Sequence, residues 1–151
     1  MTVKNKIINS MKIEFRAKSA NEAFARSAVA SFASLCDPSV GVIADIKTIV
    51  SEAVTNAVVH AYADKPDRSA CTVYIICDLY DNGRLRIKIR DHGRGIEDIT
   101  RAMEPMFTTD AENERSGMGF TVMQSFSDRI SVRSAPGKGT TVTLVKELLG
   151  N

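Results

Sequence analysis

The sequence predicts an α+β fold, a two-layer sandwich in which helices cover one face of a mixed, mostly antiparallel sheet. Two observations support this class. After one short strand pattern, patterns typical of helices occupy residues 19–62, and runs rich in Val, Ile and Tyr follow from residue 71. The later strands also fall into antiparallel pairs joined by glycine-containing turns, whereas a doubly wound sheet would alternate strands with helices.

Length and composition are those of one globular domain, expected to span residues 1–151. The chain is 44% hydrophobic and 25% charged, which is ordinary for such a domain. Twenty Lys and Arg against eighteen Asp and Glu give a net charge of +2 without a long run of one sign. We therefore expect no direct contact with nucleic acid.

Cellular context follows from what the sequence lacks. The three cysteines have no CxxC spacing, which argues against a disulfide framework or a zinc site and favours reduced thiols. No signal peptide is evident, and no stretch reaches the roughly 20 apolar residues that a membrane span needs. We expect a cytoplasmic protein that does not contact membranes.

The first part of the chain predicts a strand and then a helix. Residues 1–10 are expected to be a frayed extension, and the alternation of polar and apolar residues at 12–16 predicts a strand. Ser19 with Glu22 three residues later has the spacing of a capping box, so the first helix is expected to begin there.

A second, long helix should begin after Asp37 or Ser39, either of which can act as its N-cap, and should run to about Tyr62. Glu52, Asn56 and His60 lie at i, i+4 and i+8 along it. At about 100° per residue, its aliphatic residues gather on one side and the Glu52 and Asn56 side chains point roughly the opposite way. A carboxylate beside a carboxamide suits a proton acceptor beside a metal ligand. An ordinary surface pair on an amphipathic helix is the alternative.

The remaining elements are a hairpin, a long loop and a second pair of strands. Strands at 71–80 and 85–90 flank Asp81-Asn82-Gly83, in which Asn-Gly favours the positive φ values of tight hairpins. Residues 97–116 read as a long loop with a short helix near 99–103. Loops of this length are commonly functional, so a lid is expected. A helix at 117–126 and strands at 128–134 and 140–146 follow at the end of the chain.

Three glycine-containing elements could build a site. Asp91 stands at a strand end next to glycines, where a flat ligand could approach the backbone closely. A carboxylate there could accept a hydrogen bond from an exocyclic amine; a polar turn is the alternative. Gly117 and Gly119 open a helix, whose N-terminal N–H groups favour phosphate, although a glycine-rich entry to a helix is common. The turn at 137–139 is read as a hairpin. Neither a Walker pattern nor a Rossmann GxGxxG is present, and no Ser-His-Asp triad is convincing.

Taken in order, Glu52-x-x-x-Asn56, Asp91-x-Gly93-x-Gly95, Gly117-x-Gly119 and Gly139-Thr140 resemble the N, G1, G2 and G3 boxes of the GHKL family of ATP-binding domains. This resemblance runs from about residue 43 to residue 145 and implies the Bergerat ATP-binding fold. The segments 51–58, 107–109 and 114–120 closely resemble the anti-sigma-F family of endospore-forming bacteria, in a match that covers nearly the whole chain.

The resemblance assigns roles residue by residue. Glu52 would be the catalytic general base on a serine hydroxyl, and Asn56 would hold Mg²⁺. Asp91 would accept the adenine amino group, and Gly117 and Gly119 would donate N–H groups to phosphates. Thr108, Thr109 and Arg115 would belong to a mobile lid. The residues implied for binding ATP or ADP are Asn56, Asp91, Gly93, Gly95, Thr108, Thr109, Arg115, Gly117, Gly119 and Thr140.

The resemblance also implies activity and partners. A member of this family binds and inhibits the RNA polymerase sigma-F factor and phosphorylates a serine of the anti-anti-sigma factor, using ATP and Mg²⁺. A homodimer is implied, and Arg26 on the first helix is a candidate contact for sigma. Two alternatives stay open: a general-stress-type anti-sigma switch kinase, and a non-catalytic binding module switched by nucleotide.

Overall fold

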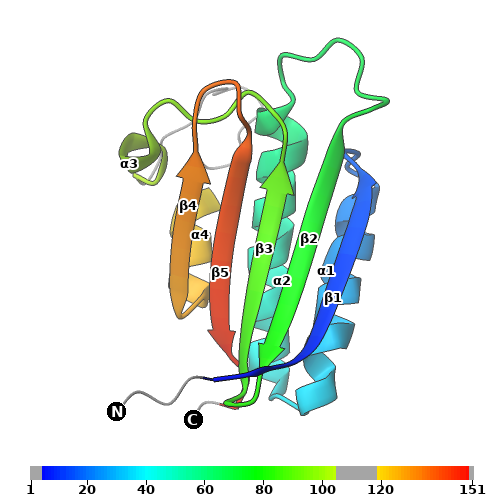
Figure 1. Cartoon of the computed structure of the whole chain (residues 1–151), viewed down its shortest axis with the longest axis vertical. Helices are drawn as coiled ribbons and strands as arrows, with labels where there is room; N and C mark the ends of the chain where they lie inside the picture. The colour runs from blue at the N-terminus through cyan, green and yellow to red at the C-terminus, as the bar shows by residue number, and fades with distance from the viewer. Residues whose placement is uncertain (1–4, 105–118, 150–151) are drawn as a thin grey trace.

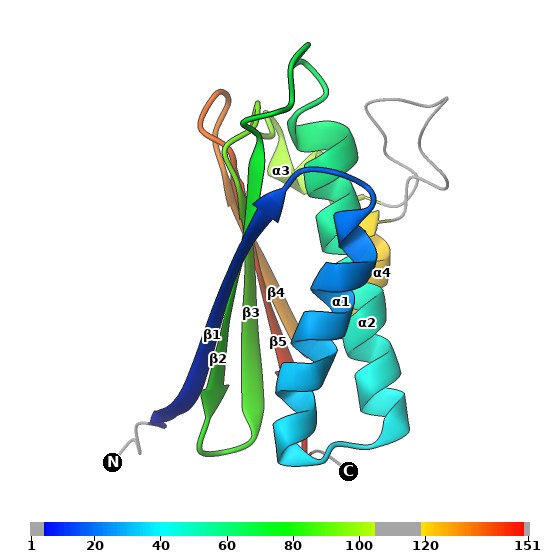
Figure 2. The same ribbon diagram turned by 90° about the vertical axis from the view of Figure 1, so that its right-hand side faces the viewer.

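The computed structural model describes residues 5–104 and 119–149. In this part of the chain, helices cover one face of a five-stranded sheet with the order β1-β2-β3-β5-β4, and the other face is uncovered (Figures 1 and 2). Every neighbouring pair of strands is antiparallel. The predicted α+β class and the two-layer arrangement are confirmed.

The elements have the following bounds. The helices are α1 (Asn21–Ala33), α2 (Val40–Thr55), α3 (Ile99–Ala102) and α4 (Gly119–Phe126). A 3-10 turn, η1 (Ser34–Cys36), follows α1, and a π-helical segment, η2 (Asn56–Ala61), continues α2. The strands are β1 (Ile7–Arg16), β2 (Thr72–Tyr80), β3 (Arg84–Asp91), β4 (Arg129–Ser134) and β5 (Thr140–Glu147).

The beginning of β1 differs from the prediction. We expected residues 1–10 to be frayed, but the strand starts at Ile7, which pairs with Tyr80 of β2. The side chains from Ile7 to Ser10 are all exposed, so this part of the strand shows no alternation of buried and exposed residues. Its pairing comes from backbone hydrogen bonds, which leave no mark in the side-chain pattern.

One of the two predicted helix caps is correct. Ser39 caps α2, with its Oγ accepting a backbone N–H at 3.2 Å. The capping box at Ser19 is wrong, because the N-cap of α1 is Ala20, which makes no side-chain cap hydrogen bond. Glu22 instead accepts a hydrogen bond from Thr55 Oγ1 at 2.9 Å and so links α1 to the end of α2.

The predicted hairpin joins β2 to β3, although its backbone differs in detail. Gly83 has φ 85°, and Asn82 is not among the residues with positive φ. The turn is closed by Gly83 N donating to Tyr80 O at 3.0 Å, and Asn82 Oδ1 accepts from Arg84 N at 3.1 Å. The positive φ therefore falls on glycine alone.

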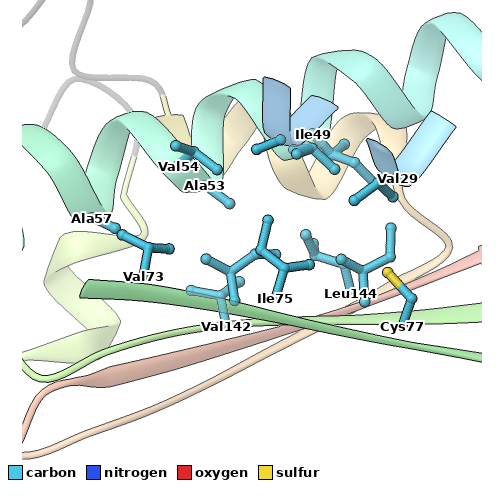
Figure 3. Packing of buried hydrophobic residues seen from close by; sticks show 14 of the residues in the cluster. Val29, Ile49, Ala53, Val54, Ala57, Val73, Ile75, Cys77, Val142 and Leu144 are labelled. Atoms are coloured by element: carbon cyan, nitrogen blue, oxygen red, sulfur yellow. The ribbon is translucent and has the colours of Figure 1, made fainter. Parts of the chain in front are cut away.

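The core lies between the sheet and the helices. Figure 3 shows Ile49, Ala53 and Val54 of α2 facing Ile75 and Leu144 of the sheet, and all five side chains are buried. Cys71 and Cys77 belong to this core and Cys36 packs against it, and all three thiols are free, as expected. Burial raises the pKa of the Cys77 thiol to about 12. Within residues 5–104 and 119–149, no helix is both long and apolar enough to cross a membrane.

The aliphatic rows of the sheet end in a polar row. Ile89, Val142 and Val132 occupy adjacent register positions on β3, β5 and β4. The next register positions on the same face are occupied by Asp91 and Ser134, two residues later on β3 and β4, and by Thr140, two residues earlier on β5. Because directly opposed residues share a face of the sheet, the three polar side chains extend toward the helix layer. They form one end of the core and the beginning of the site.

Candidate functional site

A cavity of about 540 Å³ opens beside the polar row, between η2, the end of β3, the start of β5, α3 and the start of α4. Its volume is within the roughly 300–1,000 Å³ typical of small-molecule sites. Five of the residues predicted for the site line it: Asn56, Asp91, Gly95, Gly119 and Thr140. These residues come from all four sequence boxes, so the fold brings the separate boxes to one place.

The α2–η2 helix places its polar pair against the first residue of α4. A Cβ added to Gly119 would lie 3.2 Å from Asn56 Oδ1 and 3.5 Å from Glu52 Oε2. Glu52 does not itself line the cavity but lies beside the glycine that does. Asn56 is also the first residue of the π-helical segment. Such segments inside α-helices are frequent at functional sites.

Asp91 is buried, with 6% of its surface exposed, and its carboxylate has defined partners. Its Oδ1 accepts from Gly93 N at 2.9 Å and from Thr140 N at 3.2 Å. Burial raises the pKa of Asp91 and outweighs these two hydrogen bonds, which lower it. A carboxylate in this position can accept hydrogen bonds from a donor group of a ligand in the cavity.

The glycines beside Asp91 make room for protein backbone. A Cβ on Gly93 would lie 2.1 Å from the carbonyl oxygen of Ala61, and one on Gly95 would lie 2.0 Å from that of Ala135. We had expected a flat ligand to approach the backbone there. Gly95 lines the cavity and Gly93 does not. The loop after β3 is therefore pressed between η2 and the β4–β5 turn, and this packing shapes the cavity wall.

Four of the predicted residues cannot be placed. Thr108, Thr109, Arg115 and Gly117 fall between positions 105 and 118, outside the described residues. The predicted lid lies mostly in the same segment. The roles of these residues in binding nucleotide stay predictions.

Several residues at the site have positions that the sequence did not predict. His60, the third polar residue of the i, i+4, i+8 series, lines the cavity one turn after Asn56. The Tyr62 hydroxyl donates to Thr72 O and accepts from His92 N, both at 2.7 Å, and so holds the loop after β3 to the start of β2. The hydroxyl of Ser134 makes three contacts at the polar end of the sheet. Such roles depend on partners far away in the sequence.

The donor set at Asn56 is compatible with Mg²⁺ only if the ligand supplies further oxygens. Among the described residues, no group of three His, Cys, Asp or Glu side chains could hold a metal ion. Mg²⁺ prefers six oxygen ligands and is commonly held by one or two protein side chains, water and substrate phosphates. Asn56 Oδ1, on the cavity wall next to Gly119, is a suitable single oxygen ligand of this kind.

Comparison with known proteins identifies the class. A family model described as "Histidine kinase-like ATPase domain" matches residues 15–146. Among solved structures, the RsbU and RsbW domains of Rv1364c from Mycobacterium tuberculosis match with a TM-score of 0.67 at 21% identity, covering 93% of this chain and 32% of that chain. The shared fold and the matched family define a histidine kinase-like ATPase domain, which binds nucleotide.

Curated relatives are more specific. The chain is 51% identical over 138 residues to the anti-sigma F factor of Caldanaerobacter subterraneus subsp. tengcongensis, covering 91% of this chain and 93% of the relative. It is 50% identical over 140 residues to the anti-sigma F factor of Oceanobacillus iheyensis, covering 93% of each. Within the ATPase class, the chain belongs to the anti-sigma F factor family. The resemblance that the four boxes indicated is confirmed.

Proposed function

We propose that this chain binds and inhibits the sporulation sigma-F factor and, as an ATP-dependent protein serine kinase, inactivates the anti-anti-sigma factor by phosphorylation. One observation carries the kinase assignment. Glu52 Oε2 and Asn56 Oδ1 both lie beside Gly119, and Asn56, Gly119 and Asp91 line one cavity. This proximity supports the proposed roles of Glu52 as general base, Asn56 as metal ligand and Asp91 as the carboxylate that recognises adenine.

The nucleotide would bind with its adenine toward Asp91, whose carboxylate accepts a hydrogen bond from the exocyclic amino group. Its phosphates would lie toward Asn56 and the first turn of α4, where backbone N–H groups attract anions. The burial of Asp91 supports this orientation, because a hydrogen bond in a site shielded from water discriminates strongly between ligands.

In phosphoryl transfer, Glu52 would take the proton of the substrate serine hydroxyl. The serine oxygen would form a bond to the γ-phosphorus as the bond from that phosphorus to the β–γ bridging oxygen breaks, leaving ADP. Mg²⁺ bound through Asn56 would supply charge neutralisation on the phosphates. Such reactions depend mainly on positioning and electrostatics, which suits a site with a single acid–base residue.

The proposed partners rest on the family. The relatives named above are anti-sigma F factors, and we extend to this chain a sigma-F partner, an anti-anti-sigma substrate and a homodimer. Arg26 on α1 is the proposed contact for sigma. Its side chain is 41% exposed and lies 3.5 Å from Glu22 one turn earlier, so this surface ion pair would have to open or be shared on binding.

The test mixes the purified protein with γ-labelled ATP, Mg²⁺ and a purified anti-anti-sigma protein. Phosphoserine on that partner is expected with the wild type and is expected to be lost with Glu52→Gln, while ATP binding is kept. Glu14→Gln, an exposed carboxylate on β1, is the matched control and should transfer normally.

Two other results would change the proposal. If ATP is bound and no phosphate is transferred, the protein is a binding module switched by nucleotide. If it transfers phosphate but, in a binding assay with both purified sigma factors, binds a general-stress sigma factor in preference to sigma-F, it is a stress-type switch kinase. Transfer by Glu52→Gln would refute the general-base assignment alone.

A further inference from the structure

The hydroxyl of Ser134 joins three segments around the polar row. Ile96 N donates to Ser134 Oγ at 2.8 Å, and Ser134 Oγ donates to Gly139 O at 2.9 Å. The same oxygen lies 2.8 Å from Thr140 Oγ1. Ser134 ends β4, Ile96 lies in the loop after β3, and Gly139 is the last residue before β5.

Counting protons fixes the direction of the remaining bond. A serine hydroxyl has one hydrogen and two lone pairs. The hydrogen of Ser134 goes to Gly139 O and one lone pair accepts from Ile96 N. The hydrogen between Ser134 and Thr140 must therefore come from Thr140, which fills the second lone pair of Ser134. All the hydrogen-bonding capacity of Ser134 is used inside the protein.

This arrangement decides what Thr140 can offer to a ligand. Thr140 lines the cavity, and its hydroxyl hydrogen is already committed to Ser134. Its oxygen can then only accept. Its backbone N donates to Asp91 Oδ1 at 3.2 Å, so the same residue also orients the carboxylate. This end of the cavity presents acceptors, which matches a ligand group that carries two N–H donors.

We propose that Ser134 is a positioning residue for nucleotide recognition. Its hydroxyl accepts the hydrogen of the Thr140 hydroxyl, so that Thr140 Oγ1 can only accept hydrogen bonds beside Asp91. Its hydrogen bonds to Ile96 N and Gly139 O hold these two segments in place beside the cavity. It touches no ligand in this scheme and acts through Thr140 and the two loops. The inference rests on the proposed adenine site. It adds to that site the residue that determines whether the Thr140 hydroxyl donates or accepts hydrogen bonds there.

The test compares two nucleotides and three variants by calorimetry. ATP is compared with purine riboside triphosphate, which lacks the 6-amino group. The variants are Ser134→Ala, Ser134→Thr, which keeps a hydroxyl, and Ser131→Ala, an exposed serine of the same strand that pairs on the opposite face. Circular dichroism melting checks that each variant is folded.

Ser134→Ala is expected to lose roughly tenfold in ATP affinity and much less in affinity for the analogue, so that the preference for ATP shrinks. Ser134→Thr should restore the preference, and Ser131→Ala should leave it unchanged. If Ser134→Ala weakens both nucleotides equally, or neither, the inference is overturned, because a general loosening of the fold would not distinguish them. A wild-type protein without preference for ATP would instead refute the adenine assignment at Asp91.

Discussion

Gly119 lies so close to Asn56 that a Cβ on the glycine would be 3.2 Å from the Asn56 Oδ1 atom. The two residues come from different boxes of the sequence and meet where α4 begins beside the α2–η2 helix. The glycine therefore leaves space at the point where the proposed phosphate site, metal ligand and general base come together.

Gly119→Ala is expected to impair the site without harming the fold. The backbone of Gly119 does not have a positive φ, so alanine can adopt it. The added methyl group would crowd Asn56 and Glu52, and we expect ATP affinity to fall about tenfold, which corresponds to about 1.4 kcal/mol. Calorimetric titration with ATP measures this, and the melting temperature should not decrease.

Gly41→Ala in α2 is the matched control, since a Cβ there would meet only Ser39 Oγ, at 3.9 Å. It should bind ATP as the wild type does. Normal ATP affinity in Gly119→Ala would show that the phosphates do not approach this glycine.

Asp91→Asn is expected to lose ATP affinity at least tenfold while the folded protein becomes more stable at neutral pH. Burial raises the pKa of Asp91 above its ordinary value of 3.8, so the native protein holds this proton more tightly than the unfolded chain does. The stability contributed by the protonated Asp91 carboxyl is therefore fully present below pH 3.8. It is lost as the pH rises above 3.8 and through the raised pKa of the folded protein. Asparagine carries no charge and avoids this loss.

Melting temperatures measured from acidic to neutral pH check the sign of this effect. The advantage of Asp91→Asn over the wild type should be largest at neutral pH and should shrink as the pH approaches the ordinary Asp value. A variant that melts lower than the wild type at neutral pH would show that the hydrogen bonds of the carboxylate outweigh the cost of its burial.

Arg68 is expected to stabilise the helix that carries Asn56. Its guanidinium donates to Val58 O at 2.7 Å. The N–H groups of Tyr62 and Ala63, which could otherwise reach that carbonyl, are directed to His60 O. Arg68→Ala should lower the free energy of unfolding by about 1–3 kcal/mol, because it leaves a carbonyl without its partner.

Denaturant unfolding measures this loss, and Lys65→Ala, an exposed residue of the same loop, is its control. ATP affinity should fall with Arg68→Ala as well, because the end of η2 supplies Ala61 and His60 to the cavity. Equal stability of the two variants would mean that solvent replaces the arginine at no cost.

Tyr62→Phe removes a hydroxyl that bridges Thr72 O and His92 N. Because Tyr62 is buried, with 2% of its surface exposed, water cannot easily replace the lost bonds. We expect a loss of about 1–3 kcal/mol in the free energy of unfolding. Tyr74→Phe, on the uncovered face of β2, should change stability little, and a similar loss in both variants would contradict the bridging role.

Local sequence patterns predicted most of the helices and strands and one of the two helix caps. Ser39 caps α2 as predicted, because its partner is a backbone N–H three residues along the same helix. Ser19 carries the same kind of signal and does not cap α1. Its expected partner Glu22 is held by Thr55 on the neighbouring helix, and a contact between helices cannot be read from the spacing within one of them.

The sequence by itself determined the order of helices and strands, the polar pair Glu52 and Asn56 and the boxes that identify the family. Periodicity, turn chemistry and short motifs all act over a few residues, so they are readable along the chain. Only the tertiary structure decided that Gly93 and Gly95 accommodate backbone and that Ser134 ties the polar row together. These roles depend on steric contacts and hydrogen bonds between residues far apart in sequence, which exist only once the sheet and helices have packed.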